Sequence, residues 1–168
     1  MNKILVIGSC GAGKSTLSVA LSEKSGIPVI HLDSLFWKEN WTPSTNEELD
    51  AAIRAASKAE SWIMDGNYSR TLPMRLELCD CVIFLDLPRY LCLCRILKRV
   101  CKYYGKCRPD MGKNCPERLD FSFLQYVWHF KRTQRPKIIE ILKNSRNYTV
   151  ITLKSRAEIK DFISKFQP

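Results

Sequence analysis

The sequence predicts a doubly wound α/β fold, in which a five-stranded parallel sheet carries helices on both faces. Five short apolar segments alternate along the chain with segments of helical periodicity. The apolar segments are continuous runs, as expected for strands that are buried on both faces of a parallel sheet. A glycine-rich stretch joins the first of these strands to the first helix.

Local signals predict the bounds of each element. The predicted strands are residues 3–7, 29–32, 61–64, 81–85 and 148–153. Helices are expected from 13 to 26, from 45 through 56, from 88 onward, around 124–128 and from 155 through 166. Thr45 and Ser155 each precede a glutamate by three residues, which is the spacing of a helix-capping motif. Pro136 should interrupt or kink the fourth helix, and residues 102–118 are rich in turn formers.

Length and composition favour one globular domain over residues 1–168. Hydrophobic residues make up 45% of the chain and charged residues 26%, which is ordinary for a folded protein. No apolar run approaches the roughly 20 residues that span a bilayer, and the first apolar run is too short for a signal peptide. We therefore expect a cytoplasmic protein without membrane contact, whose eight cysteines stay reduced. The net charge of +10 favours polyanionic partners, either nucleotides or nucleic acid.

The glycine-rich stretch Gly8-Ser-Cys-Gly-Ala-Gly13-Lys14-Ser15 matches the phosphate-binding P-loop (Walker A) pattern at every invariant position. Glycines let successive N–H groups point inward, and the N-terminus of the following helix adds positive potential. Lys14 should reach the β- and γ-phosphates of ATP, and the Ser15 hydroxyl should ligate Mg²⁺. The expected nucleotide-binding residues are Gly8, Ser9, Cys10, Gly11, Ala12, Gly13, Lys14, Ser15 and Thr16. Cys10 is interpreted as a small filler of the loop.

Three carboxylates stand at the ends of predicted strands, where ligands bind in open α/β sheets. Asp65 is interpreted as a Mg²⁺-organising acid that acts directly or through water. Asp33 should order the metal waters or accept a hydrogen bond from a substrate hydroxyl. Asp86, which is followed by Leu-Pro, is more typical of a helix cap.

Four further segments, together with the P-loop, resemble the bacterial DNA topology modulation proteins over nearly the whole chain. The segments are His31-Leu-Asp-Ser-Leu-Phe-Trp37 with Trp41-Thr-Pro43, Asp65-Gly-Asn-Tyr-Ser69, Arg108-Pro-Asp-Met111 and Cys115-Pro-Glu-Arg118. That family consists of small P-loop NTPases of the adenylate-kinase-like group. The resemblance implies a nucleoside monophosphate kinase type of fold, with an acceptor-binding section near residues 33–60 and a lid near residues 102–120.

Two shorter segments resemble adenylate kinases. Asp65-Gly-Asn-Tyr-Ser-Arg70-Thr71 is similar to their D-G-F-P-R-T segment with one residue inserted, which implies that Arg70 grips a phosphate on the acceptor. Arg95-Ile-Leu-Lys-Arg99 is similar to their R-I-x-x-R segment, which implies that Arg95 covers the donor base and Arg99 reaches phosphate. The acceptor-binding section departs from theirs, because it is short and carries tryptophans without a counterpart. The identity of the acceptor therefore stays open.

Phosphoryl transfer needs cations over the transferred group, and several arginines lie in or beside the predicted lid. Arg99 and Arg132 are candidate catalytic residues together with Lys14, and Arg108, Arg118 and Arg135 are candidate lid residues. The competing interpretation of all these arginines is a solvated basic surface. The lid cysteines lack the C-x2-C spacing of a zinc site, so zinc is not favoured.

The aromatic residues near Asp33 have two interpretations. Trp37 and Trp41 could stack on a planar acceptor or pack the following helix. Trp37 is therefore a candidate acceptor-binding residue along with Asp33 and Arg70. His31 is interpreted as a packing residue of its strand, and contact with the substrate is the less favoured alternative.

The leading hypothesis is an ATP-dependent phosphotransferase that uses Mg²⁺ and a small acceptor such as a nucleotide or nucleoside. The alternative is a DNA-associated, topology-modulating regulator that binds nucleotide without kinase activity. It rests on the net charge and on the basic residues from Lys131 to Lys137. Because no segment resembles a DNA-recognition helix, nucleic acid is the less favoured partner. The sequence carries no signal for an oligomeric state.

Overall fold

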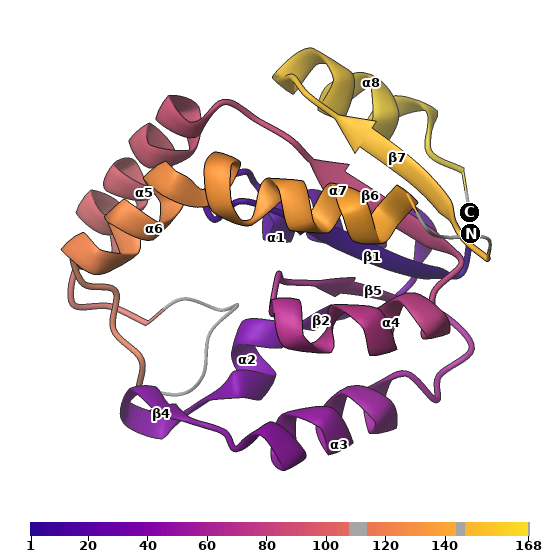
Figure 1. The fold of residues 1–168 in the computed structure, drawn as a ribbon, viewed down its shortest axis with the longest axis horizontal. Coiled ribbons are helices and arrows are strands. Elements are labelled where there is room, and N and C mark those ends of the chain that lie inside the picture. The colour runs from indigo at the N-terminus through magenta and orange to yellow at the C-terminus, as the bar shows by residue number, and fades with distance from the viewer. Residues whose placement is uncertain (108–113, 144–146, 168) are drawn as a thin grey trace.

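A computed structural model describes residues 1–107, 114–143 and 147–167 of the chain. Its centre is a sheet of five parallel strands in the spatial order β2-β5-β1-β6-β7, drawn in Figure 1. The strands are β1 (Lys3–Gly8), β2 (Val29–His31), β5 (Trp62–Asp65), β6 (Cys81–Leu85) and β7 (Thr149–Leu153). In this register Ile4 lies opposite both Ile63 and Cys81. The predicted doubly wound parallel sheet is thereby confirmed.

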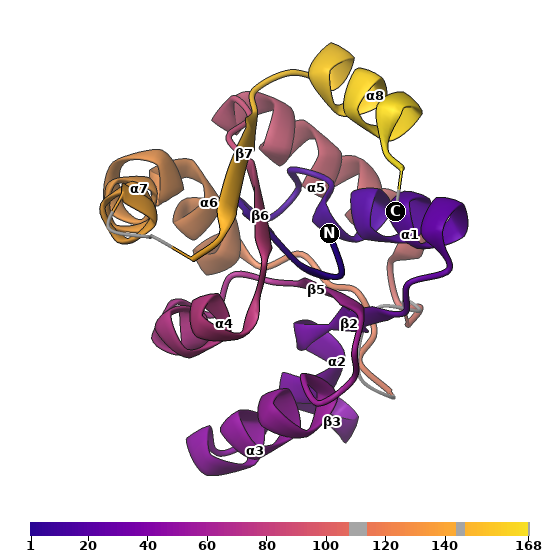
Figure 2. The same ribbon diagram turned by 90° about the vertical axis from the view of Figure 1, so that its right-hand side faces the viewer.

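Helices cover both faces of the sheet. They are α1 (Lys14–Ser25), α2 (Leu32–Phe36), α3 (Asn46–Ala56), α4 (Leu72–Leu78), α5 (Arg89–Tyr103), α6 (Phe121–Thr133), α7 (Arg135–Lys143) and α8 (Arg156–Lys165). Figure 2 shows α1, α5 and α8 on one side of the sheet and α4, α6 and α7 on the other. No helix in the described part of the chain is both long and apolar enough to cross a membrane.

The two faces of β1 explain the two halves of the core. Ile4 and Val6 are fully buried on one side, among residues of α1 and α5. Leu5 and Ile7 point the other way and join a cluster with residues of α3, α4 and α7. Alternation of side chains along a strand places a continuous apolar run in contact with both helix layers. Strand β1 is therefore buried on both of its faces.

Most of the predicted helix boundaries are confirmed. Thr45 and Glu48 form a complete capping box on α3, and Ser155 caps α8 by accepting from Glu158 N. The fourth predicted helix is broken at Gln134, so that α6 and α7 are separate helices and Pro136 lies in the first turn of α7. The second strand ends at His31, one residue early, because Leu32 begins the short helix α2.

A small hairpin follows α2 and was not expected from the sequence. Strands β3 (Trp37–Lys38) and β4 (Thr42–Pro43) pair antiparallel around a 3-10 turn, η1 (Glu39–Trp41). Asn40 and Trp41 adopt positive φ angles of 58° and 61°. The hairpin strands have only two residues each, and one contains proline, so period-2 patterning could not reveal them.

Candidate active site at the carboxyl ends of the strands

The P-loop leaves β1 and enters α1 at the carboxyl edge of the sheet. Gly8, Gly11 and Gly13 have φ angles of 145°, 76° and 99°, which lie outside the range that other residues readily adopt. A Cβ at Gly8 would stand 2.5 Å from the carbonyl oxygen of Leu85, and one at Gly11 would overlap the carbonyl oxygen of Cys92. The packing of β6 and α5 against the loop therefore requires glycine at both positions.

Three side chains form hydrogen bonds with the backbone of the P-loop. The Nζ of Lys14 donates to the carbonyls of Gly8 at 3.1 Å and Ser9 at 3.2 Å. The N–H of Gly8 donates to Oδ1 of Asn67, at 3.0 Å. Arg95 on α5 donates through Nη1 to the carbonyl of Ala12, at 2.8 Å. The loop is thus pre-shaped, with a lysine across it and a helix N-terminus behind it, and this donor set fits the phosphates of a nucleotide.

Asp65 is the last residue of β5 and is only 4% exposed. Its Oδ2 lies 2.9 Å from Nδ1 of His31, the residue opposite it at the end of β2. His31 is part of the strand as interpreted, and in addition it is a polar partner of the buried acid, which was not expected from the sequence. Adjacent parallel strands that end in His and Asp at matching positions were the signal in the sequence that could have revealed the contact.

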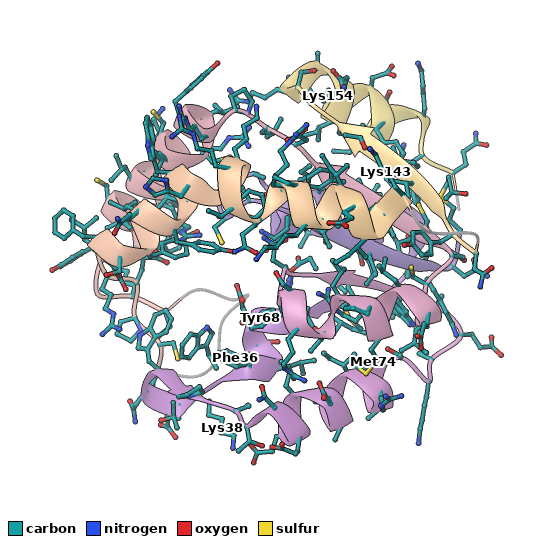
Figure 3. The ribbon with its side chains drawn as sticks, viewed as in Figure 1. Phe36, Lys38, Tyr68, Met74, Lys143 and Lys154 are labelled. Atoms are coloured by element: carbon teal, nitrogen blue, oxygen red, sulfur yellow. The ribbon has the colours of Figure 1, made fainter. Side chains whose placement is uncertain are left out.

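Asp33 lies in the first turn of α2 and is held by Tyr68. The Tyr68 hydroxyl donates to Oδ1 of Asp33 at 2.7 Å. Burial, and then the neighbouring Asp33 charge, raises the pKa of Tyr68, so the phenol remains a hydrogen-bond donor. Figure 3 shows Tyr68 beside Phe36, and their ring centroids are 5.0 Å apart. Tyr68 has an unusual φ of 27°, a conformation that persists only when contacts with other residues stabilise the loop.

Arg75 on α4 supplies that support. Its side chain is fully buried. The guanidinium donates to the carbonyl of Gly66 at 3.0 Å, to the carbonyl of Tyr68 at 3.2 Å, and also to the carbonyl of Asn67. Nε adds a bond to Oγ1 of Thr71. Burial lowers the pKa of Arg75 to about 10, so it stays charged at neutral pH.

Sequence reasoning did not identify Arg75 as important. The signal was available, because Leu72, Arg75 and Leu76 share the apolar face of one helix. A charged residue on such a face needs several internal partners, and here the partners are the carbonyls of residues 66–68. We call residues 66–68 the bridging loop, since Asn67 contacts the P-loop and Tyr68 contacts Asp33.

The two tryptophans contact each other and Phe36. The Trp37 ring meets Phe36 edge-on, with centroids 4.8 Å apart, and meets Trp41 with centroids 5.3 Å apart. Trp37 and Trp41 both remain partly exposed. Together with Tyr68, these side chains form an aromatic cluster (Phe36, Trp37, Trp41, Tyr68) next to Asp33.

Several of the candidate arginines are engaged by carboxylates. Arg70 forms a two-pronged pair with Asp50 on α3, at 2.7 and 2.9 Å. The other pairs are Arg99 with Glu117, at 3.0 Å, and Arg135 with Asp86, at 2.7 Å. Asp86 therefore does not cap α5, and the helix begins after Pro88 without a side-chain cap.

Of the three remaining candidate arginines, the catalytic candidate Arg132 and the lid candidate Arg118 are not joined to a carboxylate in the described part of the chain. Arg132 is exposed on α6. Arg118 lies over Trp41, with Cζ 5.5 Å from the ring centroid. Arg108 lies outside the described residues.

The end of the predicted lid is joined to the hairpin. Trp41 N donates to Sγ of Cys115 at 3.3 Å, and that thiol donates to the carbonyl of Lys38 at 3.3 Å. Trp41 Nε1 also donates to the carbonyl of Pro116, at 3.3 Å. Cys115 is thus a buried contact residue between two segments, and within the described ranges no three His, Cys, Asp or Glu side chains gather as a metal site would need.

Solved structures confirm the fold class. Shikimate kinase from Acinetobacter baumannii is 17% identical, with a TM-score of 0.62, over 98% of this chain and 90% of that one. Shikimate kinase from Bacteroides thetaiotaomicron is 15% identical, with a TM-score of 0.58, over 96% and 94%. A gluconokinase from Sinorhizobium meliloti 1021 is 18% identical, with a TM-score of 0.57, over 97% and 87%. At these identities the likeness concerns the fold, which is that of P-loop kinases.

Sequence comparisons complete the assignment. Curated protein sequences give no match. Residues 4–110 match the family described as AAA domain, and this segment contains the P-loop, Asp33, Asp65 and the bridging loop. Because the match extends over more than half of the chain, this protein belongs to the AAA domain family of P-loop NTPases.

Proposed function

We propose that the protein is an ATP-dependent kinase that transfers the γ-phosphoryl group to a hydroxyl of a small acceptor. The observation that carries the proposal is the bridging loop, which joins a P-loop to a carboxylate on the acceptor side. Asn67 bonds to the first glycine of the P-loop, and the next residue, Tyr68, bonds to Asp33. Three similar folds carry the names of kinases for small hydroxyl compounds, which supports the same reaction class here.

Each half of the proposed site has its own residues. On the donor side, residues Gly8 to Thr16 would bind the phosphates of ATP, with Lys14 neutralising charge on the transferred group. Ser15 and Asp65 would hold Mg²⁺, directly or through water, and the ion supplies further charge neutralisation when it is bound. His31 orients the Asp65 carboxylate through the 2.9 Å contact. Arg95 supports the loop backbone through its bond to Ala12, beside the region proposed for the donor base.

On the acceptor side, Asp33 would accept the proton of the attacking hydroxyl while Tyr68 holds the carboxylate in place. Trp37 would contact the acceptor. Arg99 and Arg132 would approach the transferred group, with the lid residues Arg108, Arg118 and Arg135 around them. Because Arg99 is paired with Glu117, it would have to exchange that partner for a phosphate oxygen when the lid segment, residues 102–120, closes on the substrates.

The test uses the full chain, ATP, Mg²⁺ and a panel of acceptors. The panel contains nucleosides, their monophosphates, shikimate, gluconate and simple alcohols, and mass spectrometry identifies any phosphorylated product. We expect one acceptor class to be phosphorylated. Asp33→Asn should abolish the transfer while leaving the affinity for ADP within about twofold, whereas Lys14→Ala should remove nucleotide binding. Normal ATP binding with no product from any acceptor would refute the proposal.

A second candidate function is the nucleotide-dependent, DNA-associated regulator implied by the resemblance to topology modulation proteins. Its support is the exposure of Lys131, Arg132 and Lys137 on α6 and α7. Such a protein should bind duplex DNA with an affinity that falls steeply with salt. The neighbouring Arg135 is engaged by Asp86, which reduces the charge available to phosphates. Absence of DNA binding at low salt would exclude this candidate.

A further inference from the structure

The acceptor-binding section is acidic in a strongly basic chain. Residues 33–60 contain six carboxylates and three lysines or arginines, whereas the whole chain has a net charge of +10. The six carboxylates are Asp33, Glu39, Glu47, Glu48, Asp50 and Glu60. With six carboxylates and three basic residues, this section has a formal net charge of −3. An anionic acceptor would approach a negative region, which opposes its binding.

Lys38 within this section and Arg70 beside it are both paired with carboxylates. Lys38 pairs with Glu48 at 2.6 Å. Arg70, the residue expected to grip an acceptor phosphate, places both prongs of its guanidinium on Asp50 and adds a bond to the carbonyl of Asn46 at 3.2 Å. The bond from Arg70 lowers the pKa of Asp50, so this carboxylate keeps its charge near neutral pH. A phosphate at Arg70 would have to displace Asp50 and then remain close to it, as two like charges.

Among the described residues, the side chains beside Asp33 that could recognise an acceptor are those of the aromatic cluster, with Arg118 over Trp41. The rings of the aromatic cluster stand 4.8 to 5.3 Å from their neighbours and are partly exposed at Trp37 and Trp41. Arg118 makes a cation–π contact with Trp41, and a planar guanidinium can itself serve as a surface on which rings stack. The carboxylate of Asp33 would accept the proton of a substrate hydroxyl group.

We propose that the acceptor is an uncharged hydroxyl compound with a planar ring, namely a nucleoside, and not a nucleoside monophosphate or a sugar acid. This inference rests on the proposed kinase function. In the reaction the acceptor hydroxyl oxygen forms a bond to the γ-phosphorus while the bond from that phosphorus to the bridging oxygen of ADP breaks. The hydroxyl proton passes to Asp33 and then to solvent. The products are ADP and a nucleoside monophosphate.

Binding tests the substrate class without requiring turnover. The full chain, saturated with ADP, is titrated by calorimetry with adenosine, guanosine, cytidine and uridine, and with the 5′-monophosphate of each. At least one nucleoside should bind about tenfold or more tightly than its own monophosphate. Trp37→Leu should weaken the binding of that nucleoside by about tenfold, since it removes an aromatic ring on which the base would stack. Equal or tighter binding of the monophosphates, or no nucleoside binding at all, would overturn the inference.

A charge variant tests the physical reason. Asp50→Asn releases Arg70, so the monophosphate should bind about three- to fivefold more tightly while nucleoside binding stays the same, as expected for an exposed ion pair. Asp161→Asn is the matched control, because it makes the same charge change at an exposed pair with Lys165 on α8. If the two variants behave alike, the role assigned to Asp50 is wrong.

Turnover separates this inference from the kinase proposal. If the unmodified chain phosphorylates a monophosphate, shikimate or gluconate, the inference that the acceptor is uncharged is wrong, whereas the proposed kinase function is supported. A nucleoside that binds tightly but is never phosphorylated would refute the kinase function and leave the recognition chemistry standing. Phosphorylation of a nucleoside alone supports both.

Discussion

Replacing Arg75 by methionine tests whether a buried arginine holds the bridging loop. The side chain is fully buried and donates to three carbonyls and one hydroxyl. Hydrogen bonds to a charged group contribute about 1.5–3 kcal/mol each. Burying the guanidinium opposes this gain by several kcal/mol. The difference leads us to expect a loss of about 3 kcal/mol in the free energy of unfolding.

Urea denaturation followed by circular dichroism measures this loss directly. At about 2–4 °C per kcal/mol for a chain of this size, the melting temperature should fall by about 6–12 °C. Arg54→Met is the matched control, since Arg54 is exposed on α3, and it should change stability by less than about 0.5 kcal/mol. Arg75→Met should also weaken ADP binding below its melting range, because the loop carries Asn67. Equal stability of the two variants would refute the reasoning.

Three other substitutions test the P-loop, the bridging loop and an ion pair of α3. Gly11→Ala should lower ADP affinity at least about tenfold in calorimetry, because the residue has a φ of 76° and no room for a Cβ; unchanged affinity would contradict the loop geometry. Tyr68→Phe should cost about 1 kcal/mol of stability and raise the acceptor KM without altering ADP affinity, since it removes only the bond to Asp33; weaker ADP binding would place the hydroxyl on the donor side. Hydrogen bonds from Lys38 and from the Thr45 backbone lower the pKa of Glu48 below its ordinary value of 4.5. These bonds therefore stabilise the folded protein above pH 4.5, and this contribution is lost as the pH falls through the lowered pKa. Glu48→Gln should therefore flatten the acid end of a stability-versus-pH curve, and an unchanged curve would refute the assignment.

Local features were predictable because each depends on residues that are near one another in the sequence. The P-loop, the five strands, the capping box at Thr45 and the break before Pro136 all follow from patterns a few residues long. The hairpin from Trp37 to Pro43 was missed for the same reason, since its strands are too short to show a pattern. The placement of Asp33 within the helix α2 was also missed, by a one-residue error in the end of the second strand.

The carboxylate partners of Arg70 and Arg135 could not be predicted, because they lie far from these arginines in the sequence. Arg70 and Asp50 are 20 residues apart, and Arg135 and Asp86 are 49 apart. In a chain with a net charge of +10, every arginine looks available for phosphate. The packing of helices against the sheet determines which of them are engaged by carboxylates.

Features that depend on residues close together in the sequence could therefore be predicted, and features that depend on residues far apart required the folded structure. Phosphate binding can be predicted from consecutive residues, since backbone N–H groups and a helix N-terminus are local features. The acceptor side depends on contacts among α2, α3, the bridging loop and the lid end, which come together only when the chain folds. Arg75 makes the point in one residue: in the sequence it is one arginine among many, and in the folded protein it holds the loop that joins the two halves of the site.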